Sequence, residues 1–302
     1  VFRSNFPEVP YVLEKDLKEF PPKKLAEMLS VDHVDLIVGG PPCQGFSTVR
    51  QVDGSNSGDR LVDDDRRELF YELLNYVEYF QPKIFIMENV PGIRSAVGGH
   101  FFTQVQMEAR KLGYRVHGEI IRAADYGVPQ KRRRQLIIGT QLDLPLFSGY
   151  LHLKTTHGNA EGLKPKVTLW EAIGDLPPLD AGSGEEQCDY DLERRKKHLQ
   201  KYGSGYLIDV LEVDQANKIT AHVARPHSER DLRDFKRLRE GETSAHAISR
   251  GEQMEFPYDR STFKDRYTRQ HRDTQCSTIV AHLSKDGLMF IHPTQDRSLT
   301  PR

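Results

Sequence analysis

The 302-residue sequence predicts an α/β protein: an open, largely parallel sheet with helices on both faces, followed by a smaller and less regular region. Two observations predict this fold class. Short apolar runs typical of buried strands alternate with segments of helical periodicity as far as about residue 148. Beyond about residue 150 the apolar runs shorten, and glycine, proline and charged residues become denser.

Four apolar runs predict the strands of the sheet, at residues 34–38, 83–87, 114–121 and 135–139. In an open sheet of this kind, ligands bind beyond the carboxyl ends of the strands. Residues that directly follow these runs are therefore the first candidates for a functional site.

Three segments between the runs predict helices. Residues 22–29 follow a proline and have another in the first helical turn, where the missing N–H costs no hydrogen bond. Residues 68–79 carry apolar side chains at helical spacing, and residues 101–112 form the third predicted helix.

The composition excludes several classes of protein. No apolar run approaches the ~18 residues that a membrane-spanning helix needs, and no signal peptide is visible. The three cysteines, Cys43, Cys188 and Cys276, lie far apart, which excludes a disulfide framework and gives no metal-ligand spacing. The formal net charge of −1 does not indicate a nucleic-acid-binding protein, although basic residues can still cluster locally.

Cys43 is the candidate nucleophile. It follows the first predicted strand within the segment Gly-Gly-Pro-Pro-Cys-Gln-Gly-Phe-Ser at residues 39–47. A thiol becomes reactive as the thiolate, which nearby cations or a helix N-terminus favour. An isolated cysteine is more often a small buried core residue, but a core cysteine needs neither the preceding prolines nor the following glycine.

Two acidic residues also follow apolar runs. Glu88 ends the run 83–87, and Asp16 follows the short run 11–13. A carboxyl group in the position of Glu88 could hold a proton on a ring nitrogen, as general acid–base chemistry requires. The alternative for Glu88 is a cap of the following turn. Because Asp16, Cys43 and Glu88 all follow strands, we expect them at one edge of the sheet.

Two charged runs complete the candidate site. If residues 130–134 (Gln-Lys-Arg-Arg-Arg) form a strand, Arg132 and Arg134 share one face with Gln130 and could converge on an anion or a carbonyl oxygen. The alternative is a solvated basic turn. Arg66 precedes the helix 68–79 and could bind a phosphate, although the acids beside it are also typical of a helix N-terminus.

These blocks, in this order, resemble the DNA cytosine-5 methyltransferases. The family pattern is Pro-Cys-Gln, then Glu-Asn-Val, then Gln-x-Arg-x-Arg, and it stands here at residues 42–44, 88–90 and 130–134. The resemblance covers nearly the whole chain, including residues 169–177 and 292–300. It implies a Rossmann-like, S-adenosylmethionine-dependent methyltransferase sheet with helices on both faces and a smaller, irregular target-recognition domain.

The resemblance also implies the domains and the cofactor. We expect a catalytic domain over residues 1–148, a target-recognition domain over 149–275, and a return segment toward the catalytic domain over 276–302. The implied cofactor is S-adenosylmethionine. Its binding residues would be Asp16 at the adenine, Leu17 beside it and Pro42 at the methionine end.

The glycine-rich cofactor motif and the last motif of the family are expected outside the two ends of the sequence, within a longer frame. We expect no metal site.

The chemistry that the resemblance implies is a covalent one. The Cys43 thiolate would attack C6 of a cytosine flipped out of the duplex, and Glu88 would hold N3. Arg132 would contact O2 of the base, with Arg134 in support. The implied DNA-binding residues are Gln44, Ser47, Arg66 and Gln130.

The implied partners are double-stranded DNA and a cognate restriction endonuclease. We expect a cytoplasmic monomer without membrane contact, associated with the nucleoid if the source is prokaryotic. One alternative is the related tRNA cytosine-5 methyltransferase, but its typical Cys-Phe-Thr element is not found and the recognition region is long. The other is a non-catalytic DNA-binding remnant or one half of a split enzyme.

Two basic stretches in the expected target-recognition domain, residues 225–239 and 260–272, have two interpretations. They could contact DNA, where base-edge contacts would specify sequence. Because acidic residues are interleaved in both, they could instead form a surface of salt bridges.

Overall fold

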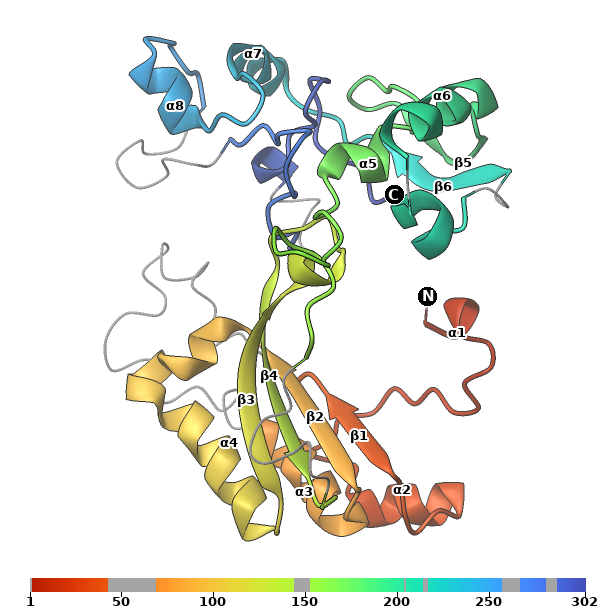
Figure 1. Cartoon of the computed structure of the whole chain (residues 1–302), viewed down its shortest axis with the longest axis vertical. Coiled ribbons are helices and arrows are strands. Elements are labelled where there is room, and N and C mark those ends of the chain that lie inside the picture. The colour runs from red at the N-terminus through yellow and green to blue at the C-terminus, as the bar shows by residue number, and fades with distance from the viewer. Residues whose placement is uncertain are drawn as a thin grey trace. The chain divides into compact units, whose positions relative to one another are not determined.

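The computed structural model describes residues 2–42, 69–143, 153–203, 205–213, 217–256, 267–280 and 287–302 (Figure 1). The chain divides into two compact units. Unit 1 comprises Val1–Ile121 and Arg134–Leu153, and unit 2 comprises Arg122–Arg133 and Lys154–Arg302. The catalytic, target-recognition and return roles that the sequence assigns to residues 1–148, 149–275 and 276–302 stay predictions.

Unit 1 is built on a four-stranded sheet with the order β1-β2-β4-β3. Its strands are β1 (Leu36–Gly39), β2 (Ile84–Asn89), β3 (Arg115–Arg122) and β4 (Arg133–Thr140). β1 and β2 are parallel, whereas β2 and β4 are antiparallel. The α/β class is confirmed, but the described sheet is mixed rather than largely parallel. The connection from β3 to β4 is too short for the crossover that parallel neighbours need.

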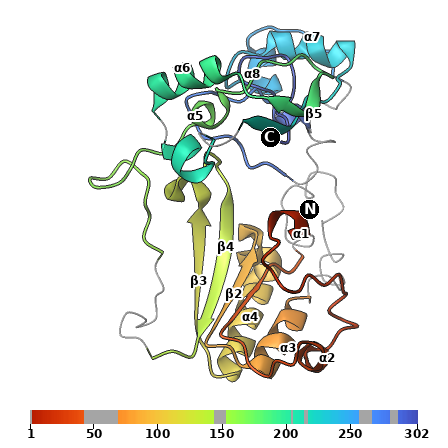
Figure 2. The same ribbon diagram turned by 90° about the vertical axis from the view of Figure 1, so that its right-hand side faces the viewer.

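The three predicted helices are present in unit 1. They are α2 (Pro22–Leu29), α3 (Phe70–Phe80) and α4 (His100–Lys111), and a short α1 (Phe2–Asn5) precedes them. α3 lies between α2 and α4 (Figures 1 and 2). Single-turn 3₁₀ helices in the two units are η4 (Pro91–Arg94), η5 (Ala96–Gly99), η6 (Ala123–Tyr126) and η9 (Gly287–Met289).

The core of unit 1 lies between α3, α4 and one face of the sheet. Alternate residues of β2, Phe85 and Met87, point into it and are buried, as the two-residue period of a strand requires. A Cβ at Gly139 of β4 would collide with the Phe85 ring, so glycine is needed there. The opposite face of β1 is open, and Val38 on it is 64% exposed.

Unit 2 has shorter elements and several small apolar clusters in place of one large core. The elements are α5 (Leu169–Ile173), β5 (Gly184–Asp189), α6 (Leu192–Tyr202), the π-helical turn η8 (Tyr206–Val210), β6 (Lys218–Val223), α7 (Glu229–Arg237) and α8 (Ser244–Ser249). β5 and β6 form an antiparallel pair. Side-chain caps begin α5, α6, α7 and α8, at Thr168, Asp191, Ser228 and Thr243 respectively. Among the described residues, no helix is long and apolar enough to cross a membrane.

Candidate functional site

The sheet of unit 1 brings Glu88 and Arg134 together. Glu88 lies near the carboxyl end of β2, and Arg134 is the second residue of the neighbouring β4. The antiparallel register pairs Glu88 with Leu136, so Arg134 is its diagonal neighbour on the same face. Arg134 Nε lies 2.5 Å from Glu88 Oε1, and the Glu88 side chain is 41% exposed. A carboxylate that is both oriented by an arginine and open to solvent is available to a ligand.

The Glu88 carboxylate also lies beside the segment that leaves β1. β1 and β2 are parallel, with Gly39 opposite Met87, which places Gly40 next to Glu88. A Cβ built on Gly40 would lie 3.5 Å from Glu88 Oε2. A Cβ on Gly39 would lie 2.7 Å from the Leu73 side chain, so the chain passes close over α3 at this point. Glycine at position 39 therefore permits the close approach of the chain to α3, whereas a Cβ at Gly40 would make an ordinary van der Waals contact with Glu88.

The Asn89 side chain bonds to the backbone at the start of the turn that follows β2. Its Oδ1 accepts a hydrogen bond of 2.8 Å from the Val90 backbone N–H, and its Nδ2 donates one of 3.2 Å to the Pro41 carbonyl oxygen. The side chain that binds this turn is thus Asn89 and not Glu88, which removes the alternative reading of Glu88 as the cap. The carboxyl ends of both parallel strands meet here, as in other open α/β sheets.

Gln130 and Arg132 lie in unit 2 and contact the segment 276–280. The Gln130 Oε1 accepts from the Ile279 backbone N–H at 3.3 Å, and Arg132 donates to the Ile279 carbonyl at 3.4 Å. The backbones of Lys131 and Cys276 are also joined, by a 2.8 Å bond. Of the two interpretations of residues 130–134, a strand over the whole segment is wrong, because β4 begins at Arg133 and the residues before it pair with this distant segment instead.

The predicted cofactor residues lie on exposed parts of unit 1. Asp16 begins a turn in which its Oδ1 accepts from the Lys18 backbone N–H at 3.0 Å. The Leu17 side chain, in the same turn, is exposed, as is Pro42 beyond β1. Their roles stay predictions.

Four predicted site residues lie outside the described residues: Cys43, Gln44, Ser47 and Arg66. Of the other two cysteines, Cys276 is buried, and burial raises the pKa of its thiol to about 12. A thiol of this kind is inert at neutral pH, unlike the nucleophile that the sequence predicts at Cys43. The described residues hold no group of three or more His, Cys, Asp or Glu side chains that could bind a metal ion.

Arg94 is a residue of this region that the sequence did not reveal. From η4 it donates to the Gln135 side chain and, at 2.6 Å, to the Gly118 carbonyl, and its guanidinium lies 4.7 Å from the centre of the Phe102 ring. The turn after β2 is therefore fixed to α4, β3 and β4 at once. No local pattern could predict these hydrogen bonds, because their partners Gly118 and Gln135 are distant in sequence.

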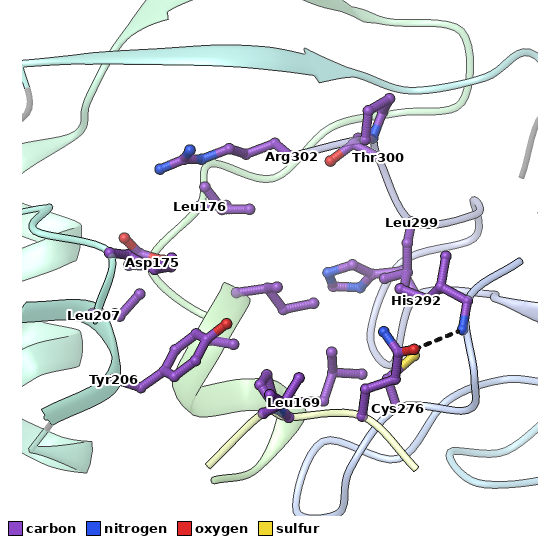
Figure 3. A pocket seen from close by; sticks show the side chains of 18 of the residues that line it. Leu169, Asp175, Leu176, Tyr206, Leu207, Cys276, His292, Leu299, Thr300 and Arg302 are labelled. Carbon is purple, nitrogen blue, oxygen red and sulfur yellow. Dashed lines mark hydrogen bonds between the residues drawn. The ribbon is translucent and has the colours of Figure 1, made fainter. Parts of the chain in front are cut away.

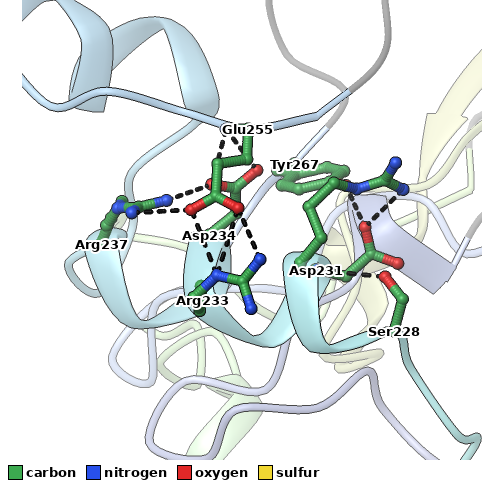
Figure 4. A network of polar contacts seen from close by, with 8 residues as sticks. Ser228, Asp231, Arg233, Asp234, Arg237, Glu255 and Tyr267 are labelled. Carbon is green, nitrogen blue, oxygen red and sulfur yellow. Dashed lines mark hydrogen bonds and ion pairs between the residues drawn. The ribbon is translucent and has the colours of Figure 1, made fainter.

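The basic stretch 225–239 forms a network of ion pairs around α7 (Figure 4). Arg233 and Arg237 both contact Glu255, at 2.7 and 2.9 Å, and their hydrogen bonds lower the pKa of Glu255 to about 2. Arg237 also contacts the fully buried Asp234, at 2.7 Å. The structure thus favours salt bridges over free cations for this stretch.

Unit 2 contains a cavity of 330 Å³ with a buried carboxylate in its wall. Asp175, 1% exposed, has no hydrogen-bond partner for either carboxylate oxygen in the described part of the chain. Burial raises its pKa, against the opposing charges of His198 and Arg302. In Figure 3, Asp175 and Arg302 lie on one side of the cavity and His292 on the other. No pattern in the sequence predicts this cavity.

Comparison with known proteins matches the whole chain to one family. The family model described as C-5 cytosine-specific DNA methylase matches residues 1–302. The type II methyltransferase M.DdeI of Desulfomicrobium norvegicum is 32% identical over 308 aligned residues, which cover 100% of this chain and 68% of that protein. M.BspRI of Lysinibacillus sphaericus, also a type II methyltransferase, is 41% identical over 202 residues, covering 65% of this chain and 42% of that protein.

The chain thus spans between 42% and 68% of the length of these two relatives. A solved structure with a similar fold is that of a prophage-encoded E. coli protein described as a DNA modification methyltransferase. The TM-score is 0.62 at 24% sequence identity, and the match covers 96% of this chain and 73% of that one. This structural similarity supports the fold.

Proposed function

Because the chain belongs to the C-5 cytosine-specific DNA methylase family, we propose that it carries catalytic residues of a DNA cytosine-5 methyltransferase. The substrate would be duplex DNA with the target cytosine flipped out of the helix, and the cofactor S-adenosylmethionine. The relatives are type II methyltransferases, which supports a role beside a cognate restriction endonuclease.

In the proposed reaction, Cys43 is the nucleophile. Its thiolate forms a bond to C6 of cytosine. The π electrons of C5–C6 shift to the C4–C5 bond and those of C4–N3 shift to N3, which takes up a proton, so that C5 becomes the nucleophilic carbon of an enamine. S-adenosylmethionine, when bound, supplies the methyl group that C5 receives. C5 then loses its proton to a base, the C6–S bond breaks, and its electrons return to the thiolate.

Glu88 would hold N3 of the base during the addition, and a proton at that position would balance the electrons that enter the ring. The observation that carries the proposal is the ion pair between Glu88 and Arg134, at the strand end that adjoins Gly40. Arg134 would keep the Glu88 carboxylate in one orientation. Arg132 would contact O2 of the base, and Gln44, Ser47, Arg66 and Gln130 would contact DNA.

The chemical character of the residues proposed to bind the cofactor suits S-adenosylmethionine. Leu17 and Pro42 present exposed apolar surface of the sort that an adenine ring or a thioether chain would cover. Asp16 Oδ1 accepts from the Lys18 backbone N–H within its turn. An adenine amino group needs an acceptor, which a carboxylate oxygen of Asp16 would provide. These three residues would hold the cofactor from the unit 1 side.

A covalent trap tests the proposal. Duplex DNA containing 5-fluorocytosine in many sequence contexts is incubated with the protein and S-adenosylmethionine, and covalent adducts are detected by mass spectrometry. Fluorine cannot leave C5 as a proton does, so the adduct should persist and map to Cys43. It should be absent from Cys43→Ser and present in the matched control Cys188→Ser.

Two other outcomes would contradict the proposal. DNA binding without an adduct would favour a non-catalytic DNA-binding protein. An adduct with tRNA but not with DNA would favour the tRNA branch of the same chemistry.

A further inference from the structure

The Asn89 side chain connects the ends of two neighbouring strands. One amide makes two bonds: Nδ2 donates to the Pro41 carbonyl, beyond β1, and Oδ1 accepts from the Val90 N–H, beyond β2. Asn89 is only 2% exposed, so water competes little for either bond. The bond to Pro41 therefore ties two segments that are far apart in sequence.

Both segments adjoin residues of the proposed reaction. Glu88 directly precedes Asn89, and Cys43 follows Pro41 by two positions in the sequence. Pro41 and Pro42 restrict their own backbone angles, and Pro42 also restricts the residue before it. A fixed carbonyl at Pro41 therefore limits the directions in which the chain can continue toward Cys43.

The bond to Val90 does not account for both interactions of the side chain. It needs only an acceptor, which Oδ1 provides. The donation from Nδ2 to Pro41 adds nothing to that local bond and acts only between the two strand ends. The two functions of this side chain can therefore be separated by changing the donor and keeping the acceptor.

We propose that Asn89 is a positioning residue, which sets the start of the segment carrying Cys43 relative to Glu88 through its bond to Pro41. This inference rests on the proposed function of Cys43 and Glu88. Misplacement of a reacting group by about 1 Å can slow a reaction by about 100-fold, so the loss of a single tether can have a large effect on rate.

The test uses Asn89→Asp, which keeps the shape and the acceptor but loses the donor, and Asn89→Ala, which introduces no charge. The matched control is Gln270→Glu, because Gln270 of unit 2 is also a buried amide, which donates to the Met289 carbonyl and accepts from the Ser277 backbone N–H. The measurement is the rate of adduct formation with 5-fluorocytosine DNA, together with the Kd for that DNA.

We expect both Asn89 variants to form the adduct about 100-fold more slowly, with an unchanged Kd, and Gln270→Glu to react at the wild-type rate. A purely structural role would instead weaken DNA binding and lower the Tm together with the rate. Wild-type rates in both Asn89 variants would overturn the inference and leave the proposed function intact.

A wild-type protein that forms no adduct would refute the proposed function, and a second measurement then decides the inference. Iodoacetamide alkylation of Cys43 is followed by peptide mass spectrometry, with Cys188 and Cys276 as internal references for unfolding. A change of about fivefold at Cys43 alone in Asn89→Asp would support the tether. An unchanged rate would overturn it.

Discussion

Arginines of the two units use their charge in different ways. In unit 1, Arg134 pairs with Glu88, whose side chain stays 41% exposed. In unit 2, Arg233 and Arg237 share Glu255, and Arg237 also holds the buried Asp234. The first pair leaves a carboxylate open to a ligand, whereas the second saturates its charges internally. The dense charges of residues 225–239 are therefore weaker evidence for a binding site than the single carboxylate of Glu88 near the end of β2.

From this difference we expect that neutralising Glu88 changes the reaction rate, whereas neutralising a carboxylate of the unit 2 ion pairs leaves the rate unchanged. Glu88→Gln should slow adduct formation on 5-fluorocytosine DNA by about 10²- to 10⁴-fold, because the group that holds the proton at N3 is lost. The free energy of unfolding should change little, since the side chain is half-exposed. Single-turnover kinetics and urea unfolding measure the two effects.

The control for this variant is Glu242→Gln, which neutralises the partner of Arg250 in unit 2. It should leave the rate unchanged. If Glu88→Gln reacts at the wild-type rate, Glu88 is no more than another surface ion pair, and the distinction between the two units disappears.

Sequence periodicity predicted the elements of unit 1 well, because each depends on local patterns. Apolar runs located β1 to β4, and helical spacing located α3. The direction of β4 relative to β2 could not be predicted, because side chains alternate in the same way along parallel and antiparallel strands. The fold class could therefore be read from the sequence, but the mixed character of the sheet could not.

The candidate site was predicted residue by residue, but its contacts were not. Glu88 and Arg134 were both recognised, yet their pairing follows from a strand register that no motif records. Arg132 was expected on a strand face with Arg134, but residues 129–131 pair with residues near Cys276, far along the chain. Contacts between distant segments, including those of Arg94, need the fold itself.

Asp234 should matter for stability and not for chemistry. Its carboxylate is 0% exposed and accepts two bonds from the Glu255 backbone N–H, at 2.9 and 3.0 Å, besides its ion pair with Arg237. Asp234→Ala leaves that N–H without its acceptor, so we expect a loss of about 2–3 kcal/mol in the free energy of unfolding. Urea unfolding measures it.

Arg233→Ala is the matched control, because its ion pair with Glu255 lies at the surface and should contribute little to the free energy of unfolding. DNA binding should be retained in both variants if the network is structural. A fall in DNA affinity without a loss of stability would show that the α7 network contacts nucleic acid after all.

Asp175 is the counterpart of Asp234 in the same unit, since it is equally buried but lacks hydrogen-bond partners among the described residues. Neutralising it should therefore stabilise the protein. At pH 7.5 we expect Asp175→Asn to raise the free energy of unfolding by about 1 kcal/mol, because an unpaired buried charge is costly. The measurement is urea unfolding of both proteins across a pH series.

The sign of the pH dependence follows from the direction of the shift. Burial raises the folded-state pKa of Asp175 above its ordinary value of 3.8. Near pH 3.8 and below, the native carboxyl is protonated and neutral like the amide, so the two proteins should have similar stability. As the pH rises from 3.8 through the folded pKa, the unfolded carboxyl ionises readily, whereas the native carboxyl ionises only against the cost of burial. The stability of the wild type therefore falls relative to that of Asp175→Asn. An equal or lower stability of Asp175→Asn at pH 7.5 would mean that the carboxylate has a partner in solution, and that Asp175 and Asp234 are alike after all.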